Sequence, residues 1–334
     1  MIMPKSSRNQ DIMTRVLSTF PNPKLKQRTP GLTVRILKEL TSPSSFQWNF
    51  RESYASLAKR VGADEETVRL TLKRAVEEGA VKGWRIVVNP HLFGQQLRGL
   101  QLDVDNEERK TEAISQLKLV EGVLLILDFH GKGMRIAFYY SNDNALDRKV
   151  KLIKSLCRFN GDVPHWYTDL PVPEMRLRPI DWSILQILLK DPRMEILPIA
   201  QKLGVSTRTV SRRLRLMTES HVAYLIPVRD VRKSRGVLVC YLVTCSTEGQ
   251  RLVESEIAAR GHQVDFVYSS LRNHFLITIL ADNLAYAEDL LSLVRSIKGV
   301  SKTRMDIMKE FIFVDDWLDE TVQSIISNSG YSPA

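Results

Sequence analysis

The sequence has few of the residues that build metal centres and disulfide frameworks. It contains three cysteines and six histidines in 334 residues. Cys157, Cys240 and Cys245 have no histidine or cysteine neighbours at zinc-finger spacing, so we expect three structural thiols. No cluster of histidine, cysteine or carboxylate residues indicates a metal site, a cofactor site or a catalytic centre. The sequence therefore predicts a protein without metal, cofactor or enzyme activity.

Long hydrophobic runs are also missing. No stretch reaches the roughly eighteen consecutive apolar residues that a membrane-spanning helix requires, and no apolar run precedes a small-residue cleavage site near the start. These absences predict a cytoplasmic protein with no membrane partner. Residues 1–28 carry six lysines and arginines against the single acid Asp11. An organellar presequence is one interpretation, and we favour the other, a flexible basic tail.

Positive charge is present in two separate blocks. The net charge of the chain is +10. Residues 1–90 and 174–235 have net charges of +8 and +7, whereas residues 91–173 and 236–334 have net charges of 0 and −5. Charge spread only for solubility would not be expected to segregate in this way. The pattern predicts two modules that face a polyanion, alternating with two that do not.

The stretch 199–217 is typical of a helix-turn-helix. Gly204 permits a tight turn, and Ser206 is a good N-cap for the second helix. Apolar residues are spaced for one buried face on each helix: Ile199, Ala200, Leu203, Val210, Leu214 and Met217. At about 100° per residue, three arginines fall on the opposite side of the second helix. An ordinary solvated face is the alternative, but we expect this side to contact DNA through Ser206, Thr207, Arg208, Ser211, Arg212 and Arg215.

Residues 54–74 repeat this motif 142 positions earlier, with Gly62 in register with Gly204. The match predicts an internal duplication. A short strand pattern follows each motif, at 82–90 and at 223–229, where a wing is expected. The candidate DNA contacts of the first copy are Arg69, Lys73, Arg74, Lys82 and Arg85. Acids at 64–66 suit the helix dipole but repel phosphate, so we expect the second copy to be the stronger DNA contact.

Each motif is followed by the order strand, helix, strand, strand, helix, strand. The first set is predicted at 99–104, 106–119, 123–129, 134–140, 143–157 and 163–169, and the second at 237–244, 248–259, 263–268, 274–280, 283–296 and 300–310. The fold class is therefore α+β, with two winged helix-turn-helix domains alternating with two ferredoxin-like βαββαβ domains. The expected parts are a basic tail (1–30), a first head (31–94), a first ferredoxin-like domain (95–173), a second head (174–235), a second ferredoxin-like domain (236–314) and a C-terminal short acidic helix with a frayed tail (315–334).

Two stretches carry a resemblance to a known family. Residues 79–94 (GAVKGWRIVVNPHLFG) are similar to the Lrp/AsnC (feast/famine) family from the end of the recognition helix through the wing to the hinge. Residues 181–193 (DWSILQILLKDPR) are similar to its first helix. The resemblance covers nearly all of residues 31–312 as two tandem copies. Members usually carry one copy, and the second copy here departs from the family pattern at 227–235.

The resemblance implies a prokaryotic transcription regulator that binds double-stranded DNA, forms homo-oligomers and takes an amino acid or another metabolite as effector. An adaptor with degenerate heads is disfavoured by the outward arginines. The rival is an enzyme, because siroheme decarboxylases resemble the same two-domain unit. Of the histidine, tyrosine and arginine expected around their central strands, the chain offers Tyr268 and His274. Fold alone does not choose between these functions.

Two smaller motifs have simple structural interpretations. Residues 130–133 (HGKG) are too short for a phosphate-binding loop, so we expect a hairpin turn. His165 and Trp166 in the last strand of the first ferredoxin-like domain are expected to pack in a core, with an effector pocket as the alternative.

Overall fold

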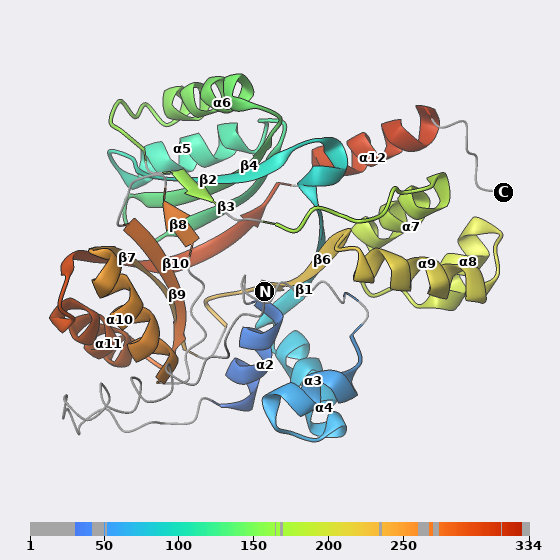
Figure 1. Cartoon of the computed structure of the whole chain (residues 1–334), viewed down its shortest axis with the longest axis horizontal. Helices are drawn as coiled ribbons and strands as arrows, with labels where there is room; N and C mark the ends of the chain where they lie inside the picture. Colours follow the sequence, from blue (N-terminus) through green and yellow to red (C-terminus); the bar gives the residue numbers. More distant parts are fainter. Residues whose placement is uncertain are drawn as a thin grey trace, which may run out of the picture. The chain divides into compact units, whose positions relative to one another are not determined.

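A computed structural model describes residues 31–41, 50, 52–163, 165–167, 170–233, 236–259, 267–269, 274–314 and 316–328 (Figure 1). The predictions of a flexible tail before Gly31 and of a frayed end after Asn328 lie outside these residues. The helices are α2 (Leu32–Thr41), α3 (Tyr54–Val61), α4 (Glu65–Glu77), the 3₁₀ helix η2 (Pro90–Phe93), α5 (Glu107–Leu117), α6 (Asp143–Leu156), α7 (Pro179–Lys190), α8 (Ile196–Leu203), α9 (Thr207–Glu219), α10 (Thr247–Ala259), α11 (Leu284–Ser296) and α12 (Asp316–Asn328). The strands are β1 (Val81–Val88), β2 (Gln96–Asp103), β3 (Val123–Phe129), β4 (Gly133–Tyr140), β5 (His165–Tyr167), β6 (Ala223–Arg229), β7 (Val237–Cys245), β8 (Val267–Ser269), β9 (His274–Ala281) and β10 (Val300–Phe313).

Two three-helix heads follow the repeat seen in the sequence. Head 1 contains α2, α3 and α4, and head 2 contains α7, α8 and α9. Gly62 and Gly204 end the middle helices in the left-handed conformation, both with φ of 63°, which a residue with a Cβ adopts at a cost. Asp64 and Ser206 then cap α4 and α9 by accepting a hydrogen bond from the backbone three residues on. The predicted duplication of the helix-turn-helix is confirmed.

Each head is followed by a ferredoxin-like plait, in which helices cover one face of an antiparallel sheet. Plait 1 contains β2 to β5 with α5 and α6, and plait 2 contains β7 to β10 with α10 and α11. Asn106, Asn142 and Asn283 cap three of the plait helices through their side-chain oxygens. The apolar faces of β2, β3 and β4 form one core with α5 and α6, and plait 2 has an equivalent core. The expected fold class and the hairpin turn at 130–133 are confirmed.

The two sheets join into one closed sheet with the strand order β10, β3, β4, β2, β5, β8, β9, β7. The joints are antiparallel pairings between plaits, β3 with β10 and β5 with β8. β10 extends to Phe313, beyond the predicted end at 310, because its first part pairs with β7 and its last part pairs with β3. Figure 1 shows β10 running from plait 2 to plait 1.

The two strands expected to form wings pair with each other and not within their own heads. β1 and β6 pair with each other in an antiparallel ribbon, with Trp84 opposite Pro227 and Val88 opposite Ala223. The ribbon therefore joins the two heads. The prediction placed each strand in a wing of its own head, because the sequence showed a strand after each recognition helix but not the partner of that strand.

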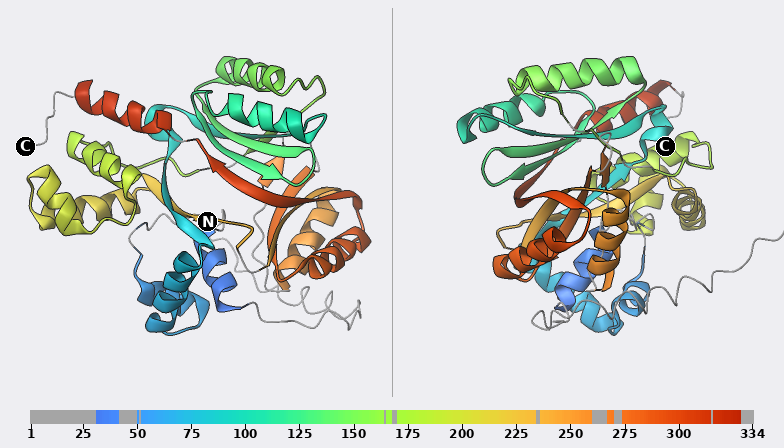
Figure 2. Two further views of the ribbon diagram at one scale, coloured as in Figure 1. Left: turned by 180° about the vertical axis from the view of Figure 1, so that it is seen from behind. Right: turned by 60° about the vertical axis from the view of Figure 1, so that its left-hand side comes forward.

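The C-terminal helix α12 is longer than the short acidic helix predicted. Leu318, Val322 and Ile326 lie one helical turn apart and are buried in the core of head 2. Figures 1 and 2 show α12 beside α7. At its start, Trp317 Nε1 donates hydrogen bonds to the carbonyls of Val123 in plait 1, at 2.7 Å, and of Val314, at 2.9 Å. α12 therefore connects head 2 to plait 1. No helix among the described residues has the length and apolar character needed to span a membrane.

Candidate nucleic-acid interface

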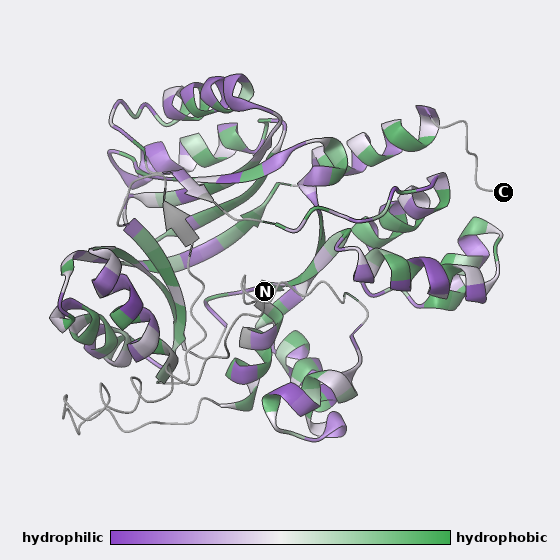
Figure 3. Ribbon diagram, in the orientation of Figure 1, coloured by the Kyte–Doolittle hydropathy of each residue, from purple (hydrophilic) through white to green (hydrophobic). Residues whose placement is uncertain are grey.

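The second helix of head 2, α9, has two faces that the sequence predicted. Val210, Leu214 and Met217 are buried in the head 2 core. Apolar and polar residues alternate around the helix in Figure 3. Ser206 Oγ accepts a hydrogen bond from the Thr209 backbone at 3.1 Å and also contacts the Thr209 hydroxyl at 2.9 Å. Ser206 is therefore occupied as an N-cap, while the first-turn backbone N–H groups point away from the body of the helix, where an anion can bind.

The predicted contact residues of head 2 are all exposed, and at about 100° per residue Arg208, Ser211, Arg212 and Arg215 lie on one side of α9. Arg208 and Arg212 form no ion pair in the described part of the chain. Arg215 Nε lies 3.9 Å from Glu219 Oε1, a weak contact between exposed side chains. Ser211 and Arg215 line a hollow of about 800 Å³ between α9 and the start of α8, together with Leu197, which is 57% exposed.

Arg213, the neighbour of Arg212, has a buried structural role. Its guanidinium donates to both carboxylate oxygens of Asp181, through Nε at 2.6 Å and through Nη2. Asp181 also accepts a hydrogen bond from the Arg178 backbone and so caps α7. The hydrogen bond with Asp181 raises the pKa of Arg213. The sequence analysis missed this pair, although the position of Arg213, three residues after Val210, places it on the buried face.

Head 1 presents a different surface at the matching positions. Arg69 donates to Glu66 through Nε at 2.8 Å and Nη2 at 2.5 Å, and Lys73 Nζ lies 3.7 Å from Glu77. The hydrogen bond lowers the pKa of Glu66 and raises that of Arg69, so the pair stays ionised at neutral pH. Leu70, 45% exposed, stands where α9 has Arg212. The basic side chains of α4, apart from Arg74, thus have acidic partners on the same helix.

The two remaining predicted contacts lie on the ribbon rather than on a recognition helix. Lys82 is exposed on β1, with its Nζ 3.5 Å from Asp230 Oδ2, and Arg85 is half-buried. Asp230 also accepts hydrogen bonds from Arg232, and these interactions lower the pKa of Asp230 to about 2. The structure therefore does not bring Lys82 and Arg85 together with Arg69 and Lys73 on one helix face.

Arg193 links the two heads and was also missed by the sequence analysis. Its guanidinium carbon lies 5.1 Å from the ring centroid of Trp84 on β1 and 5.9 Å from that of Tyr54 on α3. Phe50 reinforces this link, because it precedes α3 yet is fully buried in the core of head 2. Together with the ribbon, these contacts hold one head against the other. Only a folded structure reveals such pairing, because Trp84 and Tyr54 lie more than a hundred residues before Arg193 in the chain.

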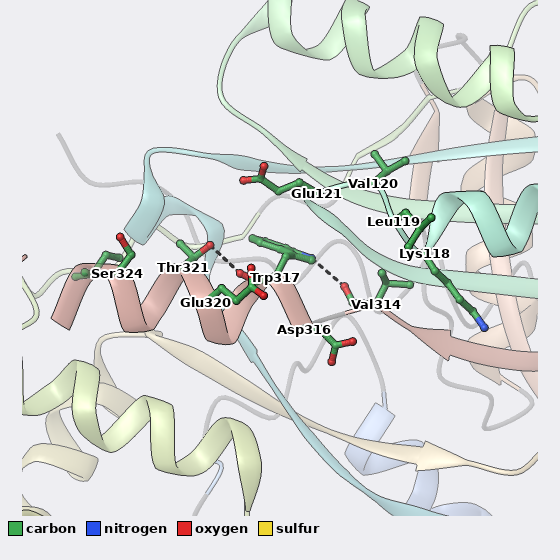
Figure 4. Close-up of a pocket in the computed structure, with 11 residues that line it drawn as sticks. Lys118, Leu119, Val120, Glu121, Val314, Asp316, Trp317, Glu320, Thr321 and Ser324 are labelled. Atoms are coloured by element: carbon green, nitrogen blue, oxygen red, sulfur yellow. Dashed lines mark hydrogen bonds between the residues drawn. The ribbon is translucent and has the colours of Figure 1, made fainter. Parts of the chain in front are cut away.

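A second hollow lies at the start of α12 (Figure 4). It measures about 540 Å³ and lies between α12 and the loop before β3. Trp317 forms one wall and packs edge-on against Tyr139, with ring centroids 5.5 Å apart. Leu119, 87% exposed, stands at its margin. The hollow thus borders the helix that connects plait 1 with head 2.

Of the two residues considered for an enzyme, the structure describes the side chain of one. His274 is partly buried at the start of β9, and the side chain of Tyr268 lies outside the described set. Trp166 is 2% exposed, which confirms the packing role expected for it. Burial lowers the pKa of His165. Among the described residues, no group of three or more histidines, cysteines or carboxylates is placed to hold a metal ion.

Comparisons with known proteins agree with a helix-turn-helix in head 2. A sequence model of the family described as winged helix-turn-helix DNA-binding covers residues 177–222, which include all of α7, α8 and α9. An uncharacterized HTH-type transcriptional regulator of Pyrococcus horikoshii is 30% identical over 145 residues, which are 42% of this chain and 97% of that protein. The chain belongs to the Lrp/AsnC family. Another relative, the HTH-type transcriptional regulator LrpA of the same organism, is 27% identical over 39% of this chain and 94% of its own length.

These Lrp/AsnC relatives align over less than half of the chain, as expected if each matches one of the two copies. A solved structure covers both. The siroheme decarboxylase NirDL superposes with a TM-score of 0.52 over 90% of this chain and 100% of that chain, at 17% identity. Its complex with an iron-uroporphyrin III analogue gives 0.51 at 16% identity. At this level of identity the likeness is one of fold: two helix-turn-helix and plait units in a single chain.

Proposed function

We propose that this Lrp/AsnC protein is a sequence-specific transcription regulator whose main DNA contact is head 2. The observation that carries the proposal is the difference between two matching helices. α9 has four arginines and one glutamate, whereas α4 has three basic and three acidic residues. Arg208 and Arg212 are exposed without an acidic partner in the described structure, while Arg69 and Lys73 are paired. An arginine that need not leave an ion pair is the better ligand for guanine or phosphate.

Contacts around Arg208 and Arg212 extend the proposed surface. Thr207 and the first backbone N–H groups of α9 would bind a phosphate at the helix N-terminus. Ser211 and Arg215, which border the hollow beside α8, would flank that contact. The first head then adds a weaker contact through Arg69, Lys73 and Arg74, with Lys82 and Arg85 along the ribbon. This arrangement gives the unequal heads that the sequence predicts.

The test compares matched double variants in the full chain. DNA fragments bound by the wild-type protein are first selected from genomic DNA at a stated salt concentration. We expect Arg208→Ala/Arg212→Ala to weaken binding to a selected fragment by tenfold or more, because a bidentate contact to a base contributes roughly 1–3 kcal/mol. The slope of log affinity against log salt is expected to fall by about two. Arg69→Ala/Lys73→Ala is the control and should have the smaller effect. A larger loss from this control pair would contradict the assignment of head 2.

We further propose that the plaits act on the heads through α12 and the ribbon. Two contacts of α12 support this route, because Trp317 bonds to Val123 of plait 1 and α12 packs against α7 of head 2. An effector such as an amino acid, or assembly into homo-oligomers, would then change the position of head 2. Screening amino acids for a change in the affinity of the wild-type protein for its selected DNA tests the effector. Sedimentation with and without DNA tests the assembly.

Tetrapyrrole decarboxylation is the second candidate, favoured by one observation. The siroheme decarboxylase superposes over both repeats of the chain rather than one. His274, at the start of β9, is one of the two residues, with Tyr268, that have the chemistry expected for such a role. Adding an iron tetrapyrrole to the purified protein should then shift the visible absorption spectrum, and His274→Ala should reduce the shift. An unchanged spectrum would remove this candidate and leave the regulator.

A further inference from the structure

Head 1 presents a leucine at a position where head 2 presents an arginine. The helices α4 and α9 match residue by residue, because each contains 13 residues and begins directly after a capping side chain. Each also begins three residues after the glycine that ends the preceding helix, Gly62 or Gly204. In this register Leu70 of α4 takes the place of Arg212 of α9. Leu70 therefore lies on the face of α4 that corresponds to the proposed DNA-contacting face of α9.

Leu70 is an isolated apolar residue on this face. It is 45% exposed, whereas Val68, Leu72 and Ala75 form the buried face of α4. Leu70 belongs to none of the hydrophobic cores that the described residues form. The residues three and four positions away, which are its neighbours on the helix surface, are all polar: Glu66, Thr67, Lys73 and Arg74. Any apolar partner of Leu70 must therefore come from outside head 1.

The size and charge of this face favour a base edge as the partner of Leu70. A stable protein interface buries about 800 Å² on each partner, which one leucine among polar residues does not supply. A thymine exposes its C5 methyl group in the major groove, where apolar side chains contact it. The cations beside Leu70 are already balanced, because Arg69 pairs with Glu66 and Lys73 pairs with Glu77. An apolar contact to a methyl group leaves both ion pairs intact, whereas a contact from Arg69 to guanine would break one.

We propose that Leu70 is a specificity-determining residue of head 1 that contacts the methyl group of a thymine. The inference rests on the proposed contact of head 1 with DNA and names the base that this head recognises. Two identical heads read two equal half-sites, because the symmetry of the DNA site follows that of the protein. Here the matching positions carry Leu70 and Arg212, so the DNA site of one chain is asymmetric, with a thymine read by head 1 and a different contact made by head 2.

The test replaces the thymines of a selected DNA fragment, one at a time, by deoxyuridine, which keeps the base pair but lacks the methyl group. We expect the wild-type protein to bind at least one substituted fragment about fourfold more weakly, as for the loss of one buried methyl-sized group. Leu70→Ala should bind the unsubstituted fragment at least as weakly and should not respond to uracil at that position, so that the two losses do not add. The matched control is Val76→Ala, because Val76 is 46% exposed in the last turn of the same helix; this variant should behave as the wild type.

The uracil scan uses the wild-type protein, so its result does not depend on how a variant folds. A scan in which no thymine methyl group affects binding would overturn the proposal, as would a methyl dependence that persists at every position in Leu70→Ala. The response to uracil should remain in Arg208→Ala/Arg212→Ala, and its loss there would overturn the proposal by assigning the methyl contact to head 2. The proposed function fails separately: DNA affinity unchanged in Arg208→Ala/Arg212→Ala would contradict the role of head 2 and leave the uracil result standing.

Discussion

Adjacent arginines of α9 have opposite roles because they face opposite ways. Arg212 is exposed, whereas Arg213 forms a buried ion pair with Asp181 inside head 2. The matching position in the first copy, Thr71, has no charge. The composition of a helix therefore overstates the number of groups available for DNA, and the direction of each side chain decides its role.

This difference predicts unequal effects on stability. Arg213→Ala leaves the Asp181 carboxylate buried without its cation, so we expect a loss of about 3–5 kcal/mol in the free energy of unfolding. Arg212→Ala, the matched control, should change it by at most about 0.5 kcal/mol. Urea denaturation followed by tryptophan fluorescence measures both. Similar losses in the two variants would show that the buried pair does not hold head 2 together.

The ion pair on α4 leads to a prediction of gained affinity. Glu66→Gln frees Arg69 and removes a repulsive charge, so the affinity of the full chain for DNA is expected to increase and the salt slope to steepen by about one. Glu65→Gln removes the same charge but keeps the Arg69–Glu66 pair, so its gain should be smaller. Fluorescence anisotropy over a salt series measures both variants. An unchanged affinity in Glu66→Gln would mean that head 1 does not approach DNA.

At the scale of elements, α12 and the ribbon determine how the heads are held. α12 follows plait 2 in the chain, yet it packs on head 2 and bonds to plait 1. The sequence predicts a short acidic helix there, and the structure shows a longer one whose apolar residues recur at helical spacing. Its partner is more than a hundred residues away and is defined only by the packed surface of α7.

Loss of packing between α12 and α7 should loosen head 2. Leu318 is fully buried, so Leu318→Ala is expected to lower the free energy of unfolding by about 2–5 kcal/mol. Ser324, exposed on the same helix, supplies the control Ser324→Ala. Hydrogen exchange should show faster exchange in α7 and α12 of the first variant, with α4 unaffected. Equal exchange in both variants would show that α12 does not support head 2.

The contribution of Asp230, beside the end of the β1–β6 ribbon, to the stability of the fold is predicted to depend on pH. Hydrogen bonds from Arg232, with the nearby Lys82, lower the pKa of Asp230 from 3.8 to about 2. A carboxyl group whose pKa is lowered by folding stabilises the fold above its unfolded pKa and loses this contribution as the pH falls through the folded value. Asp230→Asn should therefore be less stable than the wild type at pH 7, with the difference disappearing between about pH 4 and pH 2. Thermal melts across this range test it, and a difference that persists at pH 2 would contradict the assignment.

At the scale of the whole molecule, strands of one copy pair with strands of the other. β3 pairs with β10, β5 with β8 and β1 with β6, and each pair takes one strand from each copy. A single copy would leave these strand edges open, which favours association with another copy. In this chain these edges are paired within the chain itself. The six-part division of the sequence, including the boundary at 173/174, stays a prediction.

Separate production of the two copies tests this interpretation. Co-expressed segments 1–173 and 174–334, with a tag on only one of them, should co-purify and elute together, because three strand pairings and the contacts of α12 cross the cut. Substituting Phe311, which pairs opposite Leu127 across the β3–β10 joint, by proline removes a backbone donor and should weaken the complex. Segments that elute separately would show that each copy folds without the other.

The sequence by itself determined the local structure, since caps, glycine turns and apolar periodicity act within a few residues. Gly62 and Gly204 predicted the two turns, and Val210, Leu214 and Met217 predicted the buried face of α9. The exposed position of Arg208 and Arg212 followed from the same periodicity. Only the tertiary structure decided which surfaces meet: β1 with β6, α12 with α7, and Arg193 with Trp84. A repeating pattern indicates that a face is buried, but the partner of that face is chosen by packing between distant segments.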